Sequence, residues 1–283
     1  MEEAKSSTAG REFEHRVAEI LRKNDISFRE QVAVGGVEPD FLIETTDGRF
    51  VIVEAKSWPA TESSVSRAAR EVRFYREAIG VDVPIVVLKG LDRGRPAEGV
   101  VGEGQLIDSL TVALQSRPPS SGDRFSFRKF GTRRGSAEIY VDGKLSIAPQ
   151  RTIFAAMPFS GDYDDTYFVA MAHAAHSLGA VCRRIDREDF EGDIVEGIKK
   201  LIRESVAVIA DLSESKPNVL YETGFAHALS LPTVHICSSP LGELPFDVRN
   251  WNTIEYTKGQ TYALRDPLVK RLAGLLENHC CPR

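Results

Sequence analysis

Hydrophobic positions in the first 117 residues alternate between the spacing of helices and that of strands. Phe13, Val17, Ile20 and Leu21 recur at three- and four-residue intervals, which predicts an amphipathic helix over 11–24. Short apolar runs bounded by turn residues predict extended segments at 26–34, 41–44, 49–55 and 83–88. Further helical spacing at 61–79 and 105–115 flanks a glycine-rich loop at 90–104. We expect a central mixed sheet flanked by helices.

The last third of the chain alternates strands and helices more regularly. Apolar runs predict strands at 151–159, 180–186, 206–212, 232–238 and 253–256. Helical patterns follow at 164–178, 192–203, 218–229 and 262–278. Because a helix that links two strands in this order joins parallel neighbours, we expect a Rossmann- or flavodoxin-like parallel sheet with helices on both faces. Ligands of such sheets bind at the carboxyl ends of the strands. The whole chain is therefore of the α/β class.

A segment rich in Pro, Ser and Gly at 118–123 is the clearest break in the chain. It predicts an N-terminal domain at 1–117, a connector with a small β-extension at 118–150 and a C-terminal domain at 151–283. Within the connector, 125–130 and 138–141 alternate like strands, and aromatic residues interleave with basic ones. This pattern suits a nucleic-acid clamp or a β-extension packed between domains, and we favour the extension.

The composition is typical of a soluble globular protein, with 42% hydrophobic residues, 27% charged residues and a net charge of −5. We expect a cytoplasmic protein without membrane contact, because no apolar run approaches the ~18–20 residues of a membrane span and residues 1–5 lack the apolar core of a secretion signal. The cysteines form no Cys-x-x-Cys pair, which suits a reducing compartment: Cys182, Cys237, Cys280 and Cys281. With a net negative charge, any DNA binding must use local patches.

Charged residues flank the hairpin predicted from 41–44 and 49–55. Asp40 follows Pro39 just before the first strand, and Glu54 and Lys56 end the second. Strand pairing would bring two carboxylates and an ammonium close together. Two adjacent carboxylates repel each other, and a divalent cation removes that cost; oxygen ligands of this kind suit Mg²⁺ or Mn²⁺. The alternative is a surface hairpin with solvated charges.

This arrangement resembles the PD-(D/E)XK nuclease superfamily, in particular Mrr-like restriction endonucleases. The resemblance implies a restriction-endonuclease-like sheet and a Mg²⁺-dependent deoxyribonuclease, in which Asp40 and Glu54 bind the metal and Lys56 assists the attacking water. In these enzymes a G-x-x-F-E-x-x-V helix comes first, and residues 10–17 match it. The match assigns Glu14 to the metal site, the alternative being a solvated helix glutamate.

The helix that follows Lys56 carries the predicted DNA contacts. Arg67, Arg70 and Arg73 fall three residues apart and form a stripe that suits a phosphate backbone, although such stripes are also common on solvated faces. The similar enzymes often carry Gln-x-x-x-Tyr on this helix, whereas this chain has Glu71 and Tyr75. We add Tyr75 to the DNA contacts. Because many such nucleases need two active sites for two strands, the resemblance also implies a homo-oligomer.

Polar and aromatic residues gather at the predicted strand ends of the C-terminal domain. Those expected to bind a nucleotide are Met157, Pro158, Phe159, Ser160, Asp186, Asp211, Asn218, Tyr221 and Glu222. Asn218 is a suitable N-cap for the helix at 218–229, and Glu222 lies in its first turns. A helix start with a capping carboxylate is the alternative interpretation of Glu222.

The pattern M-P-F…A-D-L…P-N-V-x-Y-E-x-G-x-A-H-A-L resembles the nucleoside 2-deoxyribosyltransferase-like family and related TIR-like domains. In that family the glutamate of the Y-E-x-G segment attacks the anomeric carbon of a nucleoside, and Glu222 matches it. A carboxylate suits this role because it stabilises or bonds to an oxocarbenium-like centre. The resemblance implies that Phe159 and Tyr221 stack on a base, while Asp186 and Asp211 hold ribose hydroxyls.

Together these observations favour a metal-dependent DNA endonuclease effector, of the kind found in bacterial anti-phage defence, controlled by a nucleotide-type ligand of the C-terminal domain. A second hypothesis makes the C-terminal domain an N-glycosidase or transferase that acts on a nucleoside, nucleotide or NAD through Glu222, with the N-terminal domain binding DNA. A third is a non-catalytic scaffold of two degenerate enzyme folds, against which the intact Asp40, Glu54 and Lys56 argue.

Overall fold

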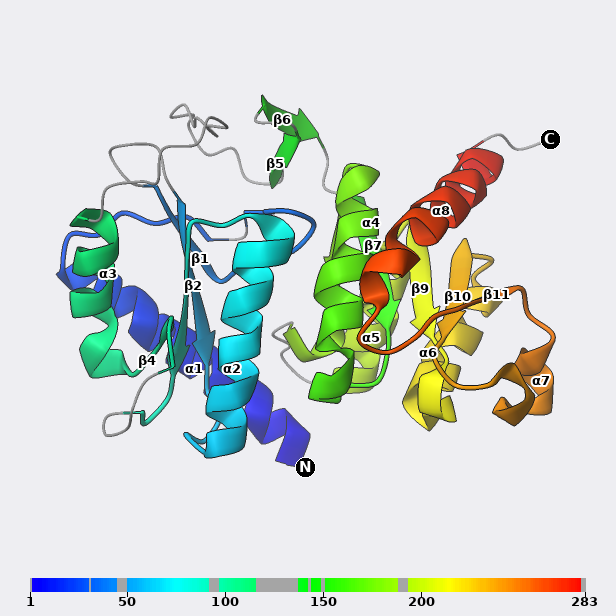
Figure 1. Cartoon of the computed structure of the whole chain (residues 1–283), viewed down its shortest axis with the longest axis horizontal. Helices are drawn as coiled ribbons and strands as arrows, with labels where there is room; N and C mark the ends of the chain where they lie inside the picture. The colour runs from blue at the N-terminus through cyan, green and yellow to red at the C-terminus, as the bar shows by residue number, and fades with distance from the viewer. Residues whose placement is uncertain are drawn as a thin grey trace. The chain divides into compact units, whose positions relative to one another are not determined.

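The computed structural model describes residues 2–30, 32–44, 50–91, 97–115, 137–141, 144–148, 151–187 and 193–280. Contacts divide the chain into two compact units, which Figure 1 shows in ribbon form. The first unit comprises 1–34 and 38–149, and the second comprises 35–37 and 150–283. The predicted linker at 118–123 and the strand expected at 125–130 lie outside the described residues.

A mixed sheet forms the centre of the first unit. Its described strands lie in the order β1 (Phe41–Glu44), β2 (Phe50–Lys56), β3 (Val83–Leu88) and β4 (Val100–Val101). Strand β1 is antiparallel to β2, and the other neighbours are parallel. Helices α1 (Glu2–Lys23), α2 (Glu62–Phe74) and α3 (Leu106–Gln115) flank the sheet, and α2 continues as a π-helical turn at Tyr75–Ile79. The predicted mixed sheet flanked by helices is confirmed.

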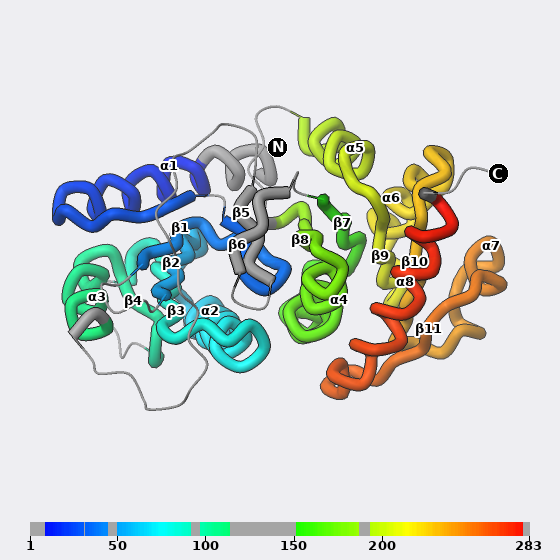
Figure 2. The backbone as a smooth tube through the Cα atoms, turned by 90° about the horizontal axis from the view of Figure 1, so that it is seen from above, coloured from blue at the N-terminus to red at the C-terminus, as the bar shows by residue number. Residues whose placement is uncertain are grey.

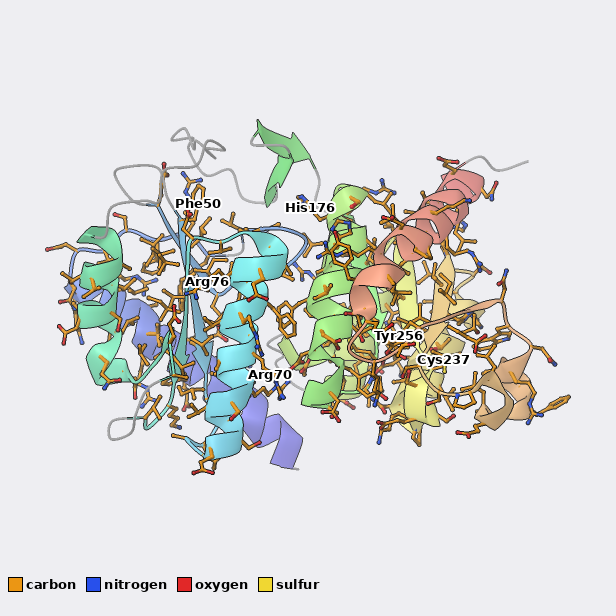
Figure 3. All side chains as sticks on the ribbon, viewed as in Figure 1. Phe50, Arg70, Arg76, His176, Cys237 and Tyr256 are labelled. Carbon is orange, nitrogen blue, oxygen red and sulfur yellow. The ribbon has the colours of Figure 1, made fainter. Side chains whose placement is uncertain are left out.

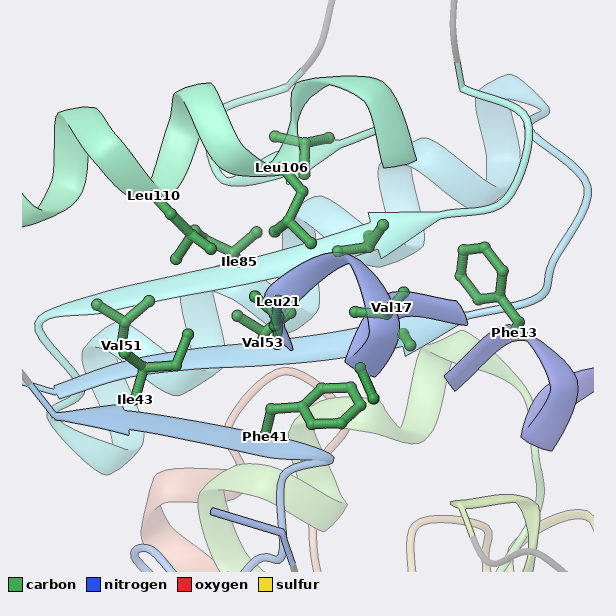
Figure 4. Close-up of a cluster of buried hydrophobic side chains, with 14 residues drawn as sticks. Phe13, Val17, Leu21, Phe41, Ile43, Val51, Val53, Ile85, Leu106 and Leu110 are labelled. Carbon is green, nitrogen blue, oxygen red and sulfur yellow. The ribbon is translucent and has the colours of Figure 1, made fainter. Parts of the chain in front are cut away.

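One face of this sheet packs against α1 and α3. Figure 4 shows the apolar side chains of this core, which come from both helices and from four strands. On β2 the members are Val51, Val53 and Ala55, which alternate along the strand. Since successive side chains of a strand point to opposite faces, Ile52, Glu54 and Lys56 belong to the other face.

The other face packs against α2. Ala68 and Val72 of α2 share a buried cluster with Val86 and Leu88 of β3. Glu54 pairs in register with Val86, and Lys56 pairs with Leu88. Neighbours in register share a face of the sheet, so the strand period itself sets Glu54 and Lys56 against α2.

Two predictions in the first unit need correction. The stretch expected to be extended at 26–34 forms no regular ladder among its described residues; Arg29 makes an isolated antiparallel bridge to Leu42. The loop expected at 90–104 contains the two-residue strand β4. In the connector, β5 (Ala137–Val141) and β6 (Lys144–Ala148) form an antiparallel pair that includes the strand expected at 138–141.

The second unit is built on a parallel sheet. Its described strands lie in the order β11 (Thr253–Glu255), β10 (Thr233–Cys237), β9 (Ala207–Asp211), β7 (Arg151–Ala156) and β8 (Ala180–Arg183), and every pair of neighbours is parallel. The predicted parallel sheet is confirmed. The chain runs from β7 to β8 at one edge and then crosses to β9 on the other side of β7. The strand order therefore reverses between β7 and β9.

Helices flank this sheet in two pairs, which can be followed in Figure 2. Helix α4 (Ala172–Ser177), preceded by a π-helical stretch at Thr166–Met171, packs on β8 and against α8 (Arg265–Cys280), which contacts β10. Helix α5 (Ile194–Glu204) packs on β7 and against α6 (Pro217–Ala228), which contacts β9. A short helix α7 (Phe246–Arg249), which the sequence pattern did not indicate, precedes β11.

Residues 35–37 belong to the second unit although they come early in the chain. The carbonyl oxygen of Gly36 accepts a hydrogen bond of 2.8 Å from the Cys182 amide. Gly36 has a φ of +87°, and a Cβ built on it would lie 2.0 Å from the carbonyl oxygen of Ala172. Only glycine fits this position.

In the described part of the chain, no helix is long and apolar enough to cross a membrane.

Candidate functional site

The end of β2 brings together three charged residues from both strands of the hairpin. Asp40 precedes β1, and its Oδ2 accepts a hydrogen bond of 2.7 Å from the Ala55 amide. Ala55 lies between Glu54 and Lys56 in the sequence, so the Asp40 carboxylate binds the backbone of the residue that separates them. Lys56 Nζ donates to Glu54 Oε2 at 2.7 Å. We call these three residues, together with Glu71 and Tyr75 of the following helix, the β2 cluster.

The helix after β2 contributes two further residues. The Tyr75 hydroxyl donates a hydrogen bond to Glu54 Oε1. Glu71 Oε1 lies 3.8 Å from Lys56 Nζ. Residues four apart share a helix face, which explains why Glu71 and Tyr75 reach the same strand end. Tyr75 is fully buried. Its predicted DNA contact is therefore wrong, because a side chain without exposed surface cannot meet DNA.

The charged side chains of this cluster are largely buried, which removes them from the water that would stabilise their charges. The Glu54 side chain is 1% exposed and the Lys56 side chain 12%. The Lys56 ammonium also lies 6.0 Å from the centroid of the Trp58 ring. The guanidinium carbon of Arg67 lies over the same ring, 4.4 Å from its centroid. Charges removed from water need close partners, since desolvation otherwise outweighs their attraction. Glu54 has such partners on both of its oxygens.

The donor set suits a divalent cation. When ionised, Asp40, Glu54 and Glu71 carry three negative charges against the one positive charge of Lys56, a net charge of −2 for these four side chains. No group of three or more His, Cys, Asp or Glu is arranged to hold a metal within the described residues. The structure therefore does not bring Glu14, a partly exposed residue of α1, into one metal-binding group with Asp40 and Glu54. Two carboxylates, completed by water and phosphate oxygens, match the coordination habit of Mg²⁺.

Basic residues of α2 and of the π-helical turn that continues it lie along one groove. Arg70, Arg73 and Arg76 line a surface groove of about 560 Å³. Figure 3 labels Arg70 and Arg76 on this helix. Arg73 is exposed, Arg67 and Arg70 are partly buried, and Arg76 donates to Glu98 at 2.9 Å. The structure therefore leaves Arg73 as the most open of the predicted DNA contacts.

The second unit places its predicted nucleotide residues around the point where the strand order reverses. The loop of Met157, Pro158, Phe159 and Ser160 follows β7, and Asp211 is the last residue of β9. Parallel strands that lead to opposite sides leave a crevice at their carboxyl ends. Phe159 is 39% exposed and Tyr221 of α6 is 48% exposed, so both rings present surface that stacking requires.

Asp211 has no exposed surface. Its Oδ1 accepts hydrogen bonds from the Ser213 amide at 3.0 Å and from the Ser213 hydroxyl at 2.5 Å, and its Oδ2 accepts one from the Tyr256 hydroxyl at 2.6 Å. Burial raises the pKa of Asp211 to about 6, although these hydrogen bonds lower it. A ribose hydroxyl would have to compete with these partners for Asp211, because both of its oxygens are engaged within the protein.

Tyr256 connects the ends of three strands. Its amide donates to the Cys237 carbonyl at 2.9 Å, and Figure 3 shows both residues close together. Ser213 joins the same network, since the Ser238 amide donates to its hydroxyl oxygen at 2.8 Å. The sequence pattern gave no signal for Tyr256, because its partner Asp211 lies 45 residues away.

Asp186 is also engaged within the protein. Arg184, which is buried, donates to both Asp186 oxygens, from Nε at 2.6 Å and from Nη2 at 3.0 Å. Its Nη1 donates to Asp164 Oδ1 at 3.1 Å. Asp186 lies in a short 3₁₀ turn beyond β8, three residues after the strand ends. A predicted ribose contact would therefore compete with a bidentate ion pair.

Glu222 differs from these paired carboxylates. It is 1% exposed, and neither of its oxygens has a hydrogen-bond partner among the described residues. Burial raises the pKa of Glu222 to about 8. Helix α6 begins at Pro217, with Lys216 at the N-cap, so Asn218 is not the cap that we expected and Glu222 lies too deep in the helix to cap it. A buried, unsatisfied carboxyl opposes folding, and groups of this kind are concentrated at functional sites.

The loop after β9 holds a strained backbone. Glu214 and Ser215 have positive φ angles of 61° and 47°. Glu214 accepts a hydrogen bond of 3.0 Å from the Tyr163 hydroxyl, lies 3.0 Å from Lys216 Nζ and 3.4 Å from Lys258 Nζ. Lys216 is the main cause that lowers the pKa of Glu214. Strained residues held by several partners often mark ligand sites, and this loop adjoins the predicted crevice.

Comparison with known proteins leaves the family open. No family model matches the chain. No curated protein matches it. Among solved structures, a 2-desoxiribosyltransferase from Leishmania mexicana is similar to part of it, with 23% sequence identity and a TM-score of 0.28. The match covers 31% of this chain and 65% of that chain, which is less than two thirds of the other protein's length. A likeness of this size does not define a function.

Proposed function

We propose that the first unit is a Mg²⁺- or Mn²⁺-dependent deoxyribonuclease. The observation that carries this proposal is the β2 cluster, where the Glu54 and Glu71 carboxylates lie near the Lys56 ammonium and Asp40 accepts from the intervening Ala55 amide. Asp40 and Glu54 would hold the metal ion. Bound there, the ion supplies electrophilic activation of the phosphodiester.

The residues of the cluster divide the remaining work. The Ala55 amide holds Asp40, and the Tyr75 hydroxyl holds Glu54, so both metal ligands are oriented before substrate arrives. The Lys56 ammonium donates to the scissile phosphate and stabilises the negative charge that develops on it during attack by water. In a site largely closed to solvent, such a preorganised charge acts more strongly than it does in water.

Basic residues on α2 would hold the DNA backbone. Arg73 is exposed at the groove, and Arg67 and Arg70 lie on neighbouring turns. Contacts of this kind bind phosphates without reading sequence, and they weaken as salt is raised. We further propose a homo-oligomer, because cleavage of both strands of a duplex needs two active sites.

For the second unit we propose a nucleotide-type ligand, bound at the carboxyl ends of β7 and β9, that controls the nuclease. Exposed Phe159 and Tyr221 support stacking on a base, and buried Glu222 supports contact with a sugar. An enzyme that degrades DNA only when such a signal is present would suit a bacterial anti-phage effector.

A second candidate function is cleavage of an N-glycosidic bond by the second unit. It is favoured by Glu222, whose carboxyl is buried, unpaired among the described residues and has its pKa raised to about 8. A carboxyl in this state can donate a proton to a leaving base or, once ionised, attack the sugar. Release of free base from a nucleotide pool by the wild type, but not by Glu222→Gln, would establish this activity.

Plasmid cleavage tests the nuclease proposal. Purified wild type is incubated with supercoiled DNA and Mg²⁺ or Mn²⁺, with and without a nucleotide pool, beside Lys56→Ala. The exposed Lys89 gives the matched control, Lys89→Ala, which removes a lysine just after β3, the strand next to β2, and keeps the backbone hydrogen bond between the Lys89 amide and the Lys56 carbonyl. We expect cleavage by wild type and Lys89→Ala and none by Lys56→Ala. Equal cleavage by all three proteins, or by none under any condition, would contradict the proposal.

A further inference from the structure

Lys56 lies between two carboxylates that come from different elements. Its Nζ is 2.7 Å from Oε2 of Glu54 on β2 and 3.8 Å from Oε1 of Glu71 on α2. Both glutamate side chains are buried, at 1% and 5% exposure. The ammonium thus hydrogen-bonds one carboxylate and has the second within about 1 Å of the ~2.7–2.9 Å typical of charge-assisted hydrogen bonds.

A divalent ion at Glu54 would compete with this ammonium. Both are cations that require the Glu54 carboxylate, and like charges at such short range repel strongly in a poorly solvated site. Tyr75 holds the other oxygen of Glu54, so Glu54 itself is anchored. The relief must therefore come from movement of Lys56, and Glu71 is the buried anion within its reach.

We propose that Glu71 is a positioning residue that receives the Lys56 ammonium when a divalent cation binds at Asp40 and Glu54. This inference rests on the proposed nuclease function and assigns to α2 two complementary tasks. Tyr75 fixes the metal ligand Glu54, and Glu71, one turn earlier on the same face, holds the lysine at the edge of the site, where the remaining N–H donors of its ammonium can still reach the scissile phosphate. Glutamate is required because its charge, unlike the amide of glutamine, compensates a buried ammonium.

The test is a double-mutant cycle on Mn²⁺ affinity, measured by titration calorimetry on the full chain. Four proteins are compared: wild type, Glu71→Gln, Lys56→Met and the double variant. With Lys56 present, Glu71→Gln should weaken Mn²⁺ binding by about tenfold, because the lysine loses the buried anion that receives it. In the Lys56→Met background the same change should alter affinity by less than about twofold. Glu62→Gln, an exposed change in the first turn of α2, is the matched control.

Trp58 supplies a second readout that does not depend on catalysis. Its ring lies 6.0 Å from the Lys56 ammonium, and the other tryptophan, Trp251, belongs to the second unit. In a Trp251→Phe background, saturating Mg²⁺ should change Trp58 emission when Lys56 is present and should leave it unchanged in Lys56→Met. Far-ultraviolet circular dichroism confirms that each variant is folded.

The outcomes separate this inference from the function beneath it. If the wild type binds Mn²⁺ but Glu71→Gln has no effect, or the same effect with and without Lys56, the transfer of Lys56 to Glu71 is refuted while the nuclease proposal stands. If the wild type binds no Mn²⁺, the proposed metal site fails and the inference fails with it.

Discussion

Replacement of Glu222 by glutamine should stabilise the second unit, by an amount that grows with pH. Burial raises the pKa of Glu222 from its ordinary 4.5 to about 8. Between these values the folded protein keeps a proton that the unfolded chain releases. Stability linked to Glu222 is therefore lost as pH rises, since the native state binds more protons. Glutamine resembles the protonated carboxyl in shape and cannot ionise, so it removes this dependence.

The size of the effect follows from the two pKa values. At about 1.4 kcal/mol for each unit of pH well above 4.5, the linkage costs the wild type about 0.8 kcal/mol at pH 5 and about 3.3 kcal/mol at pH 7. Relative to the wild type, Glu222→Gln should thus gain about 2.5 kcal/mol of unfolding free energy between pH 5 and pH 7.

Urea denaturation in a Trp58→Phe background isolates the second unit. Trp251 is then the remaining tryptophan, and its ring lies 4.4 Å from those of His227 and His235, which join α6 to β10. Midpoints are compared at several pH values between 5 and 7 at constant ionic strength. Glu277→Gln, an exposed change on α8, serves as the control and should leave the pH dependence as in the wild type.

Two results would refute this reasoning. A Glu222→Gln variant with the same pH dependence of stability as the wild type would mean that the Glu222 carboxyl ionises at its ordinary pKa, because a hydrogen-bond partner present in solution stabilises the carboxylate. A variant less stable than the wild type throughout the range would mean that the charged carboxylate contributes to folding.

The remaining predictions concern structural positions in and around the strand ends. Gly36→Ala should destabilise the second unit by about 2 kcal/mol or more, because its Cβ would collide with Ala172. Gly80→Ala, at a similar φ of +82° but in open space, should cost the first unit only about 1 kcal/mol. Urea midpoints read by Trp251 for Gly36→Ala and by Trp58 for Gly80→Ala check both values, and equal losses would contradict the steric argument. Tyr256→Phe should cost about 1.5–3 kcal/mol by removing a hydrogen bond to the buried Asp211 carboxylate, and an unchanged midpoint would show that water replaces that hydroxyl.

The fold was largely accessible from hydrophobic spacing. The strand expected at 83–88 is β3, with the same limits, because a buried central strand is continuously apolar. Strand β4 escaped notice because two residues in a glycine-rich loop carry no period. At 26–34 the apolar pattern reports burial, as Ile26 and Phe28 pack on the core, without the ladder that would make a strand. Hydropathy cannot separate these cases.

The candidate sites were accessible only in part. Motif spacing predicted that Asp40, Glu54 and Lys56 come together at one end of the hairpin, since paired strands align the residues at their ends. It could not assign Glu71 and Tyr75 to the same cluster, because that depends on where α2 crosses the sheet. For Asp211, the sequence indicated a strand end but not the Tyr256 hydroxyl that engages it.

Binding of a divalent ion by the β2 cluster is the central claim, and calorimetric titration of Mn²⁺ into the full chain tests it most directly. Asp40→Asn removes one proposed ligand, and Glu44→Gln, at the exposed end of β1, removes a carboxylate from the same hairpin outside the cluster. The account predicts that the wild type and Glu44→Gln bind Mn²⁺ alike and that Asp40→Asn binds it more than about tenfold more weakly. Equal affinity in all three proteins, or no binding by the wild type, would contradict it.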